Sequence, residues 1–179
     1  METTCLPDIE RVCLSWELFC TATTEPELKD IERNIREARS CVDHYDSSTE
    51  DGLTSRLMLS HWILARCEQY VLKSLDEAIN IFRSTISRFS TTPLAPNMLI
   101  ALGGLGKCLR WKYSRDSQAN DLEEALGYIR RTLELVPSEE RDRHNLLYYF
   151  ADITWMLFIR GRSTITSLKI AADLSLIHI

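Results

Sequence analysis

Apolar residues recur in eight segments of the chain with the period of about 3.6 residues that an α-helix requires. The clearest segment places Leu75, Ile79 and Phe82 on one side of a helix. β-branched residues do not alternate with polar residues over the length of a strand, so no strand is expected. The pattern predicts an all-α protein. The expected helices span residues 8–20, 30–45, 54–72, 74–89, 96–113, 121–136, 142–159 and 167–174.

Polar residues separate these helices and mark two of their starts. Asp46–Gly52 and residues 114–120 are expected to be loops. Ser74–Glu77 has the pattern of a capping box, in which the Ser and Glu side chains accept hydrogen bonds from free backbone N–H groups. Asp121–Glu124 is a second cap of this kind, with Asp as the acceptor. We therefore predict that these two helices begin at Ser74 and Asp121.

The chain repeats itself with a spacing of 44 to 47 residues. Leu75–Ile79 matches Leu122–Leu126 at an offset of 47, Leu168–Ala172 follows after 46 more, and Ile31–Ile35 precedes Leu75 by 44. Each copy follows an apolar segment that contains one tryptophan: Trp16, Trp62, Trp111 or Trp155. A two-helix repeat of this length predicts an α-solenoid, because a lone hairpin cannot bury its apolar side while stacked hairpins can.

Two of the units share a longer pattern. In one unit it comprises Leu102, Leu105, Gly106, Tyr113 and Asp121–Ala125, and in the next Asp142, Arg143, Leu147, Phe150, Ala151 and Phe158. These residues resemble the long tetratricopeptide-like repeats of fungal multidomain proteins, which are often found upstream of caspase-like CHAT domains. The second-helix positions of that family match Ala125, Ile129, Thr132 and Pro137. The resemblance covers about residues 53–174.

The resemblance implies a single domain over residues 1–179, folded as a right-handed solenoid of antiparallel helical hairpins. About three repeats are expected, with a degenerate N-terminal hairpin: 6–45, 53–89, 95–137 and 141–174, the last truncated. The first helices of such repeats usually line a groove for a peptide or partner helix. This analogy makes Lys107, Arg110, Asp152 and Trp155 candidate contacts. We expect Trp155 to lie in the core between repeats rather than in the groove.

Composition narrows the classes of function. The 179 residues carry 21 Lys and Arg against 26 Asp and Glu, a net charge of -5 without a basic block, which argues against binding to nucleic acid or to an anionic membrane. The acidic N-terminus lacks a signal peptide pattern. The longest apolar run, Leu146–Ile159, is shorter than the roughly 20 residues that span a bilayer. A cytoplasmic location is expected. The six cysteines contain no Cys-x-x-Cys pair, so neither a disulfide framework nor a zinc site is predicted.

Two stretches invite a chemical interpretation. Cys41 and His44 place a thiol and an imidazole one helical turn apart, as a small hydrolase might use them, although catalytic Cys and His usually lie far apart in sequence. Gly103–Gly106 contains three glycines but lacks the Gly-Lys-Ser/Thr ending and the preceding strand of a phosphate loop. We interpret these glycines as points of close helix contact. No catalytic residue, cofactor site or metal site is predicted.

These observations predict a protein-interaction scaffold that lacks catalytic activity and binds a protein or peptide. The alternative is a regulatory or sensor segment of a larger signalling protein, such as a CHAT-type peptidase or an ATPase. The apolar tail from Ser175 to Ile179 has no helix stop signal, so we expect the sequence to be a fragment of a longer protein. A hydrolase that uses Cys41 and His44 is the third possibility.

Overall fold

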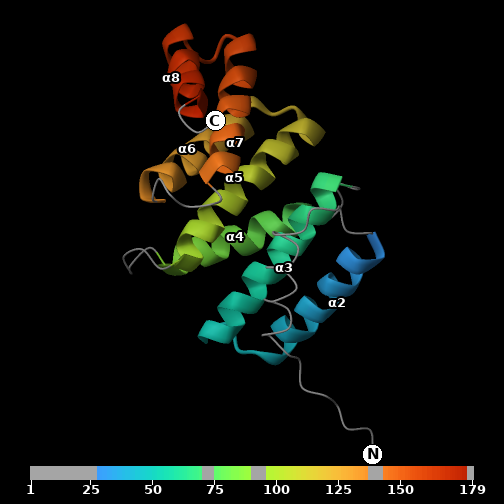
Figure 1. Cartoon of the computed structure of the whole chain (residues 1–179). Helices are drawn as coiled ribbons and strands as arrows, with labels where there is room; N and C mark the ends of the chain where they lie inside the picture. The colour runs from blue at the N-terminus through green and yellow to red at the C-terminus, as the bar shows by residue number, and fades with distance from the viewer. Residues whose placement is uncertain (1–27, 70–74, 90–95, 137–142, 177–179) are drawn as a thin grey trace, which may run out of the picture. The chain divides into compact units, whose positions relative to one another are not determined.

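A computed structural model of the chain describes residues 28–69, 75–89, 96–136 and 143–176, and these contain helices and no strand. The prediction of an all-α protein is confirmed (Figure 1). The predicted helix 8–20 and the capping residue Ser74 lie outside the described residues. The helices are α2 (Leu28–His44), α3 (Glu50–Gln69), α4 (Leu75–Phe89), α5 (Pro96–Asp116), α6 (Ala119–Leu135), α7 (Arg143–Ile159) and α8 (Ile165–Leu176). The chain divides into two compact units, residues 1–81 and 82–179.

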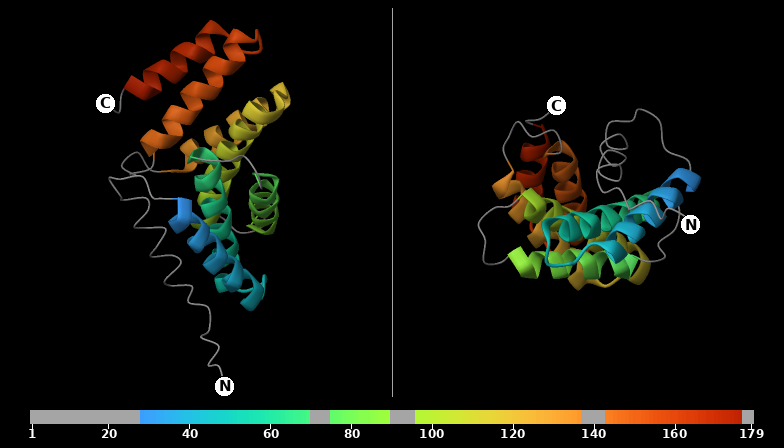
Figure 2. Two further views of the ribbon diagram at one scale, coloured as in Figure 1. Left: turned by 90° about the vertical axis from the view of Figure 1, so that its right-hand side faces the viewer. Right: turned by 90° about the horizontal axis from the view of Figure 1, so that it is seen from below.

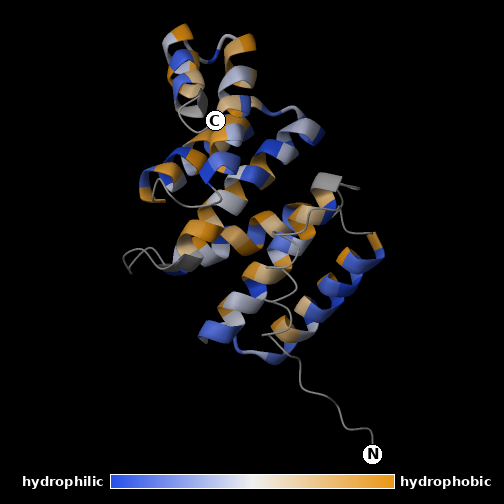
Figure 3. Cartoon of the chain, in the orientation of Figure 1, coloured by the Kyte–Doolittle hydropathy of each residue, from blue (hydrophilic) through white to orange (hydrophobic). Residues whose placement is uncertain are grey.

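In the first unit, α2 packs along α3. The buried side of α2 carries Ile31, Ile35, Ala38 and Cys41 at the spacing of a helix. The rest of α2 is mostly hydrophilic (Figure 3), because only one side of it meets the core.

The helix α3 begins earlier than predicted, because Asp46–Gly52 is not entirely a loop. Thr49 caps the helix: its Oγ1 accepts a hydrogen bond from the backbone N–H of Gly52 at 3.1 Å. Gly52 is required sterically, since a Cβ at this residue would lie 1.9 Å from the backbone oxygen of Asp46. The turn is therefore confined to Asp46–Thr49, where the Asp46 carboxylate accepts the N–H of Ser48 at 2.7 Å.

In the second unit, α5 packs on α6, α6 on α7 and α7 on α8, and α5 also contacts α7 (Figure 2). The predicted loop 114–120 is wrong in extent, because only Ser117 and Gln118 separate α5 from α6. Ser117 makes this short turn with a positive φ of 57°. Gln118 occupies the N-cap position without a side-chain hydrogen bond, so the prediction that Asp121 caps α6 is also wrong.

Three glycines let helices approach closely in this unit. A Cβ at Gly104 would lie 2.4 Å from Cζ of Phe82 on α4, and a Cβ at Gly106 would lie 2.7 Å from Ile129 on α6. A Cβ at Gly103 would lie 3.3 Å from Leu146 on α7. The glycines of α5 therefore mark contacts with three other helices, which is the packing role inferred from the sequence.

Residues at equivalent positions of the sequence repeat form one ion pair in each of the two compact units. Arg39 of α2 donates to Glu77 of α4 at 2.8 Å, and Arg83 of α4 donates to Glu124 of α6 at 2.9 Å. Arg39 and Arg83 stand eight residues after Ile31 and Leu75, the first residues of the repeated motif. The same position in α6 is Arg130. The position equivalent to the two glutamates in α8 is Ile170, so the sequence provides no carboxylate for a third pair.

Arg143, the first residue of α7, joins two helix ends. Its Nη1 donates to the backbone oxygens of Leu133 at 2.7 Å and Val136 at 2.6 Å. These carbonyls belong to the C-terminal turn of α6, where they lack partners within the helix. A positive charge is also favoured at this end of a helix. Arg143 therefore fixes the start of α7 to the end of α6.

Candidate interaction surface

The structure brings two of the four candidate contact residues, Arg110 and Asp152, into direct contact, and places the other two on the same pair of helices. Lys107 and Arg110 lie on α5, and Asp152 and Trp155 lie on α7. The Nε atom of Arg110 donates to Oδ2 of Asp152 at 2.7 Å. The Nζ atom of Lys107 lies 5.3 Å from the ring centroid of Tyr149, the distance of a cation–π contact. Trp155 follows Asp152 by three residues, so both side chains project from the same side of α7.

The ion pair between Arg110 and Asp152 joins α5 to α7 and is largely buried. Its side chains are 15% and 20% exposed. Arg110 also donates to Oγ of Ser114 at 2.6 Å, and its guanidinium lies 5.0 Å from the ring centroid of Trp111. These contacts hold the guanidinium in one orientation, so the pair fixes α7 against α5 and neutralises both charges.

Trp155 is 51% exposed, so the expectation that it lies in the core between repeats is wrong. Tyr148 and Ile159 are 66% and 60% exposed, and the spacings of seven and four residues place all three side chains on one side of α7. We call Tyr148, Trp155 and Ile159 the α7 stripe. The indole of Trp155 stacks on the ring of Phe158 at a centroid distance of 6.0 Å, which restricts its orientation.

Tyr148 and Ile159 are not recognisable as surface residues from the sequence, because α7 is apolar on nearly every side. Its opposite sides bury Leu147, Ile153 and Leu157. No polar side identifies which apolar residues face outward, and a helix of this kind is normally covered all round. The only available signal was that Tyr148 and Ile159 share a side with Trp155. A row of exposed large apolar side chains on such a helix is typical of a binding surface.

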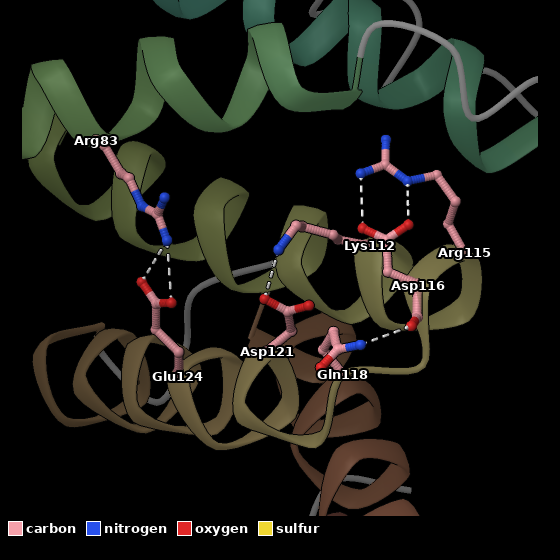
Figure 4. Close-up of polar contacts among 7 residues, drawn as sticks. All are labelled: Arg83, Lys112, Arg115, Asp116, Gln118, Asp121 and Glu124. Atoms are coloured by element: carbon pink, nitrogen blue, oxygen red, sulfur yellow. Dashed lines mark hydrogen bonds and ion pairs between the residues drawn. The ribbon is translucent and has the colours of Figure 1, made fainter.

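A second polar cluster lies where α5 meets α6, and Figure 4 shows its pairing. Lys112 donates to Oδ1 of Asp121 at 2.7 Å, so the residue predicted to cap α6 instead binds a cation of the preceding helix. Asp121 is buried, and its Oδ2 has no hydrogen-bond partner in the structure. Hydrogen bonds from Arg115 lower the pKa of the Asp116 carboxyl. Asp116 and Asp121 each have a cationic partner, and the pair of Lys112 with Asp121 links α5 to α6.

Glu124 also belongs to this cluster and accepts two hydrogen bonds from Nη2 of Arg83, at 2.9 and 3.0 Å. It has a further electrostatic effect on Tyr128, one turn along α6. Burial raises the pKa of the Tyr128 hydroxyl, and the negative charge of Glu124 raises it further. The lowered pKa of Asp116 and the raised pKa of Tyr128 both move away from neutral pH, so they do not indicate an acid–base site here.

Cys41 and His44 do not form the arrangement that a nucleophile needs. Cys41 is buried between α2 and α3, whereas His44 is exposed in the last turn of α2 with its ring edge-on to Tyr45 at 4.9 Å. A general base must reach the nucleophile by a hydrogen bond, and burial separates these two groups. The hydrolase interpretation therefore gains no support.

Within residues 28–69, 75–89, 96–136 and 143–176, no group of three or more His, Cys, Asp or Glu side chains could hold a metal ion. None of the helices described in those ranges combines the length and the apolar character needed to cross a bilayer.

The surface between α5 and α7 thus combines a fixed ion pair, a lysine above a tyrosine ring and the α7 stripe. In protein interfaces generally, aromatic residues such as tryptophan and tyrosine provide much of the contact energy. Comparison of the chain with protein families, with curated proteins and with solved structures finds no match.

Proposed function

We propose that this protein is a protein-interaction scaffold made of stacked tetratricopeptide-like hairpins, and that the α7 stripe is part of its binding surface. The internal repeat and its resemblance to the long fungal repeats support a right-handed solenoid that acts in the cytoplasm. The observation that carries the proposal is the exposure of Tyr148, Trp155 and Ile159 along one side of α7. Burying large apolar side chains of this kind is worth roughly 1.5–3 kcal/mol each.

The neighbouring contacts favour a protein partner over a small ligand. The α7 stripe extends over twelve residues of helix, and the eleven steps from Tyr148 to Ile159 amount to about 16 Å at the rise of an α-helix. The Arg110–Asp152 pair lies beside the stripe and is fixed in place. A rigid surface loses little conformational entropy when it binds a partner. A protein or peptide is therefore the ligand class that the α7 stripe fits best.

Site-specific photo-crosslinking in cells tests this proposal. A photoreactive phenylalanine replaces Trp155 in one variant and Glu134, an exposed residue of α6, in the control. We expect defined adducts with one or a few proteins from position 155 and none from position 134. Equal adducts from both positions, or none from position 155, would refute the proposal.

A further inference from the structure

The first helices of two successive repeats can be aligned residue by residue. Leu102, Leu105, Gly106 and Tyr113 of α5 correspond to Leu147, Phe150, Ala151 and Phe158 of α7, at a constant offset of 45. The same offset relates Gly103, Lys107, Arg110 and Ser114 to Tyr148, Asp152, Trp155 and Ile159. The four α7 residues of this second comparison are the α7 stripe together with Asp152. The residues of the α7 stripe therefore have known equivalents on α5.

Those equivalents on α5 face another helix. A Cβ at Gly103 would lie 3.3 Å from Leu146, Lys107 lies over Tyr149, and Arg110 pairs with Asp152. All three partners belong to α7. The side of α5 that carries these residues is thus the side on which α7 packs. Because α7 repeats the same register, its stripe lies on the side of α7 that corresponds to the helix-binding side of α5.

The charges around this surface indicate which helix would bind. The sequences of α5 and α7 contain only two carboxylates, Asp116 and Asp152. Asp116 is paired with Arg115, and Asp152 with Arg110. Lys107 and Arg160 instead contact aromatic rings, with Arg160 lying 4.9 Å from the ring centroid of Tyr113. Lys107 and Arg160 are therefore positive charges that no carboxylate of α5 or α7 pairs with, although the whole chain has a net charge of -5.

We propose that the α7 stripe binds an acidic amphipathic helix of a partner protein, which takes the position on α7 that α7 takes on α5. This inference rests on the proposed function and specifies its partner. Apolar side chains of the helix at positions i, i+4 and i+7 cover Tyr148, Trp155 and Ile159. Carboxylates beside that apolar row meet Lys107 and Arg160.

Selection from a library of random peptides of about 15 residues, or four helical turns, tests the proposal with the complete chain as bait. Peptides that also bind the Trp155→Ala variant are discarded. We expect the remaining sequences to be acidic and to repeat apolar residues with a helical period. Far-UV circular dichroism confirms that the variant is folded, as its exposed position leads us to expect.

The best peptide is then labelled and titrated by fluorescence anisotropy. Trp155→Ala and Lys107→Glu should each weaken binding by at least about tenfold, the usual size of a hot-spot effect. Lys169→Glu makes the same charge change at an exposed residue of α8 and should leave binding within about twofold, because surface charges act only over short distances in salt. Replacing the peptide's glutamates by lysines should reverse its preference between the wild type and Lys107→Glu.

Other outcomes separate this inference from the proposed function. Trp155-dependent peptides that are basic, or that lack a helical period, would overturn the acidic helix and leave the interaction surface standing. A library without any Trp155-dependent peptide would overturn both. A dimer that sedimentation detects for the wild type and not for Trp155→Ala would assign the surface to a second copy of the chain and so overturn the inference.

Discussion

Replacing a glycine inside a helix by alanine usually stabilises the helix. At Gly104 we expect the same substitution to destabilise the protein, because Gly104 packs against Phe82. In Gly104→Ala, the new Cβ would lie 2.4, 2.6 and 2.9 Å from three ring atoms of Phe82, where ordinary contact is 3.4–4 Å. The overlap is therefore about 1 Å at the closest atom. Phe82 is fully buried, so its ring cannot swing into solvent to relieve the overlap.

The expected magnitude follows from two opposing terms. Forcing an extra methyl group into a packed core typically costs about 1–3 kcal/mol. Replacing glycine by alanine inside a helix gains about 1 kcal/mol from helix propensity. Gly127 of α6 is the matched control, since it is a helical glycine with no atom within 4 Å of the Cβ position. The difference in unfolding free energy between Gly104→Ala and Gly127→Ala isolates the overlap, and we expect about 1–3 kcal/mol.

Urea unfolding followed by far-UV circular dichroism measures this difference. Gly127→Ala should raise the midpoint, and Gly104→Ala should lower it relative to that control. Adding Phe82→Leu removes the ring and should make Gly104→Ala less harmful than it is in the wild type. If Gly104→Ala stabilises the protein as much as Gly127→Ala does, the close packing of α4 on α5 is not as the structure has it.

Three further predictions concern other contacts. Gly52→Ala should lower the unfolding free energy by more than about 2 kcal/mol, since its Cβ meets immobile backbone; urea unfolding checks this, and a smaller loss would contradict the tight turn. Asp152→Ala should cost about 1.5–3 kcal/mol, because Arg110 loses a charged hydrogen bond in a largely buried place; a thermal shift below one degree would exclude that role. Ile170→Glu should stabilise by at most about 1 kcal/mol by pairing with Arg130, and the gain should disappear in high salt or in Arg130→Gln.

The helices were predictable because apolar spacing alone specifies them. Ile31, Ile35 and Ala38 are buried as their period requires. The starts of helices were less predictable, since several polar residues compete for the cap position. Thr49 accepts a hydrogen bond from the N–H of Gly52, so α3 begins before the expected residue. Asp121 turned inward to Lys112 because α6 begins before it, which sequence spacing could not reveal.

Four residues of the candidate surface were predictable, whereas Tyr148, Ile159 and the arrangement of the surface were not. Lys107 and Arg110 were predicted from the resemblance to tetratricopeptide-like repeats, and both contact residues of α7. Their partners Tyr149 and Asp152 are 42 residues further along the chain, so only the packing of the helices reveals the contacts. The exposure of Trp155 was not predictable, because it depends on what covers α7 and not on the pattern within α7.

The two hydrogen bonds of Arg143 affect how the ends of neighbouring helices open. Its guanidinium holds the carbonyls of Leu133 and Val136, so the last turn of α6 cannot fray while the first turn of α7 remains in place. The two ends should therefore open together. In native-state hydrogen exchange, Arg143→Ala should speed exchange of the amides at the C-terminal end of α6, and leave those near its middle protected. The side chain of Arg143 would thus make the end of α6 and the start of α7 open as one cooperative unit. The covalent connection between the two helices alone would not couple them in this way.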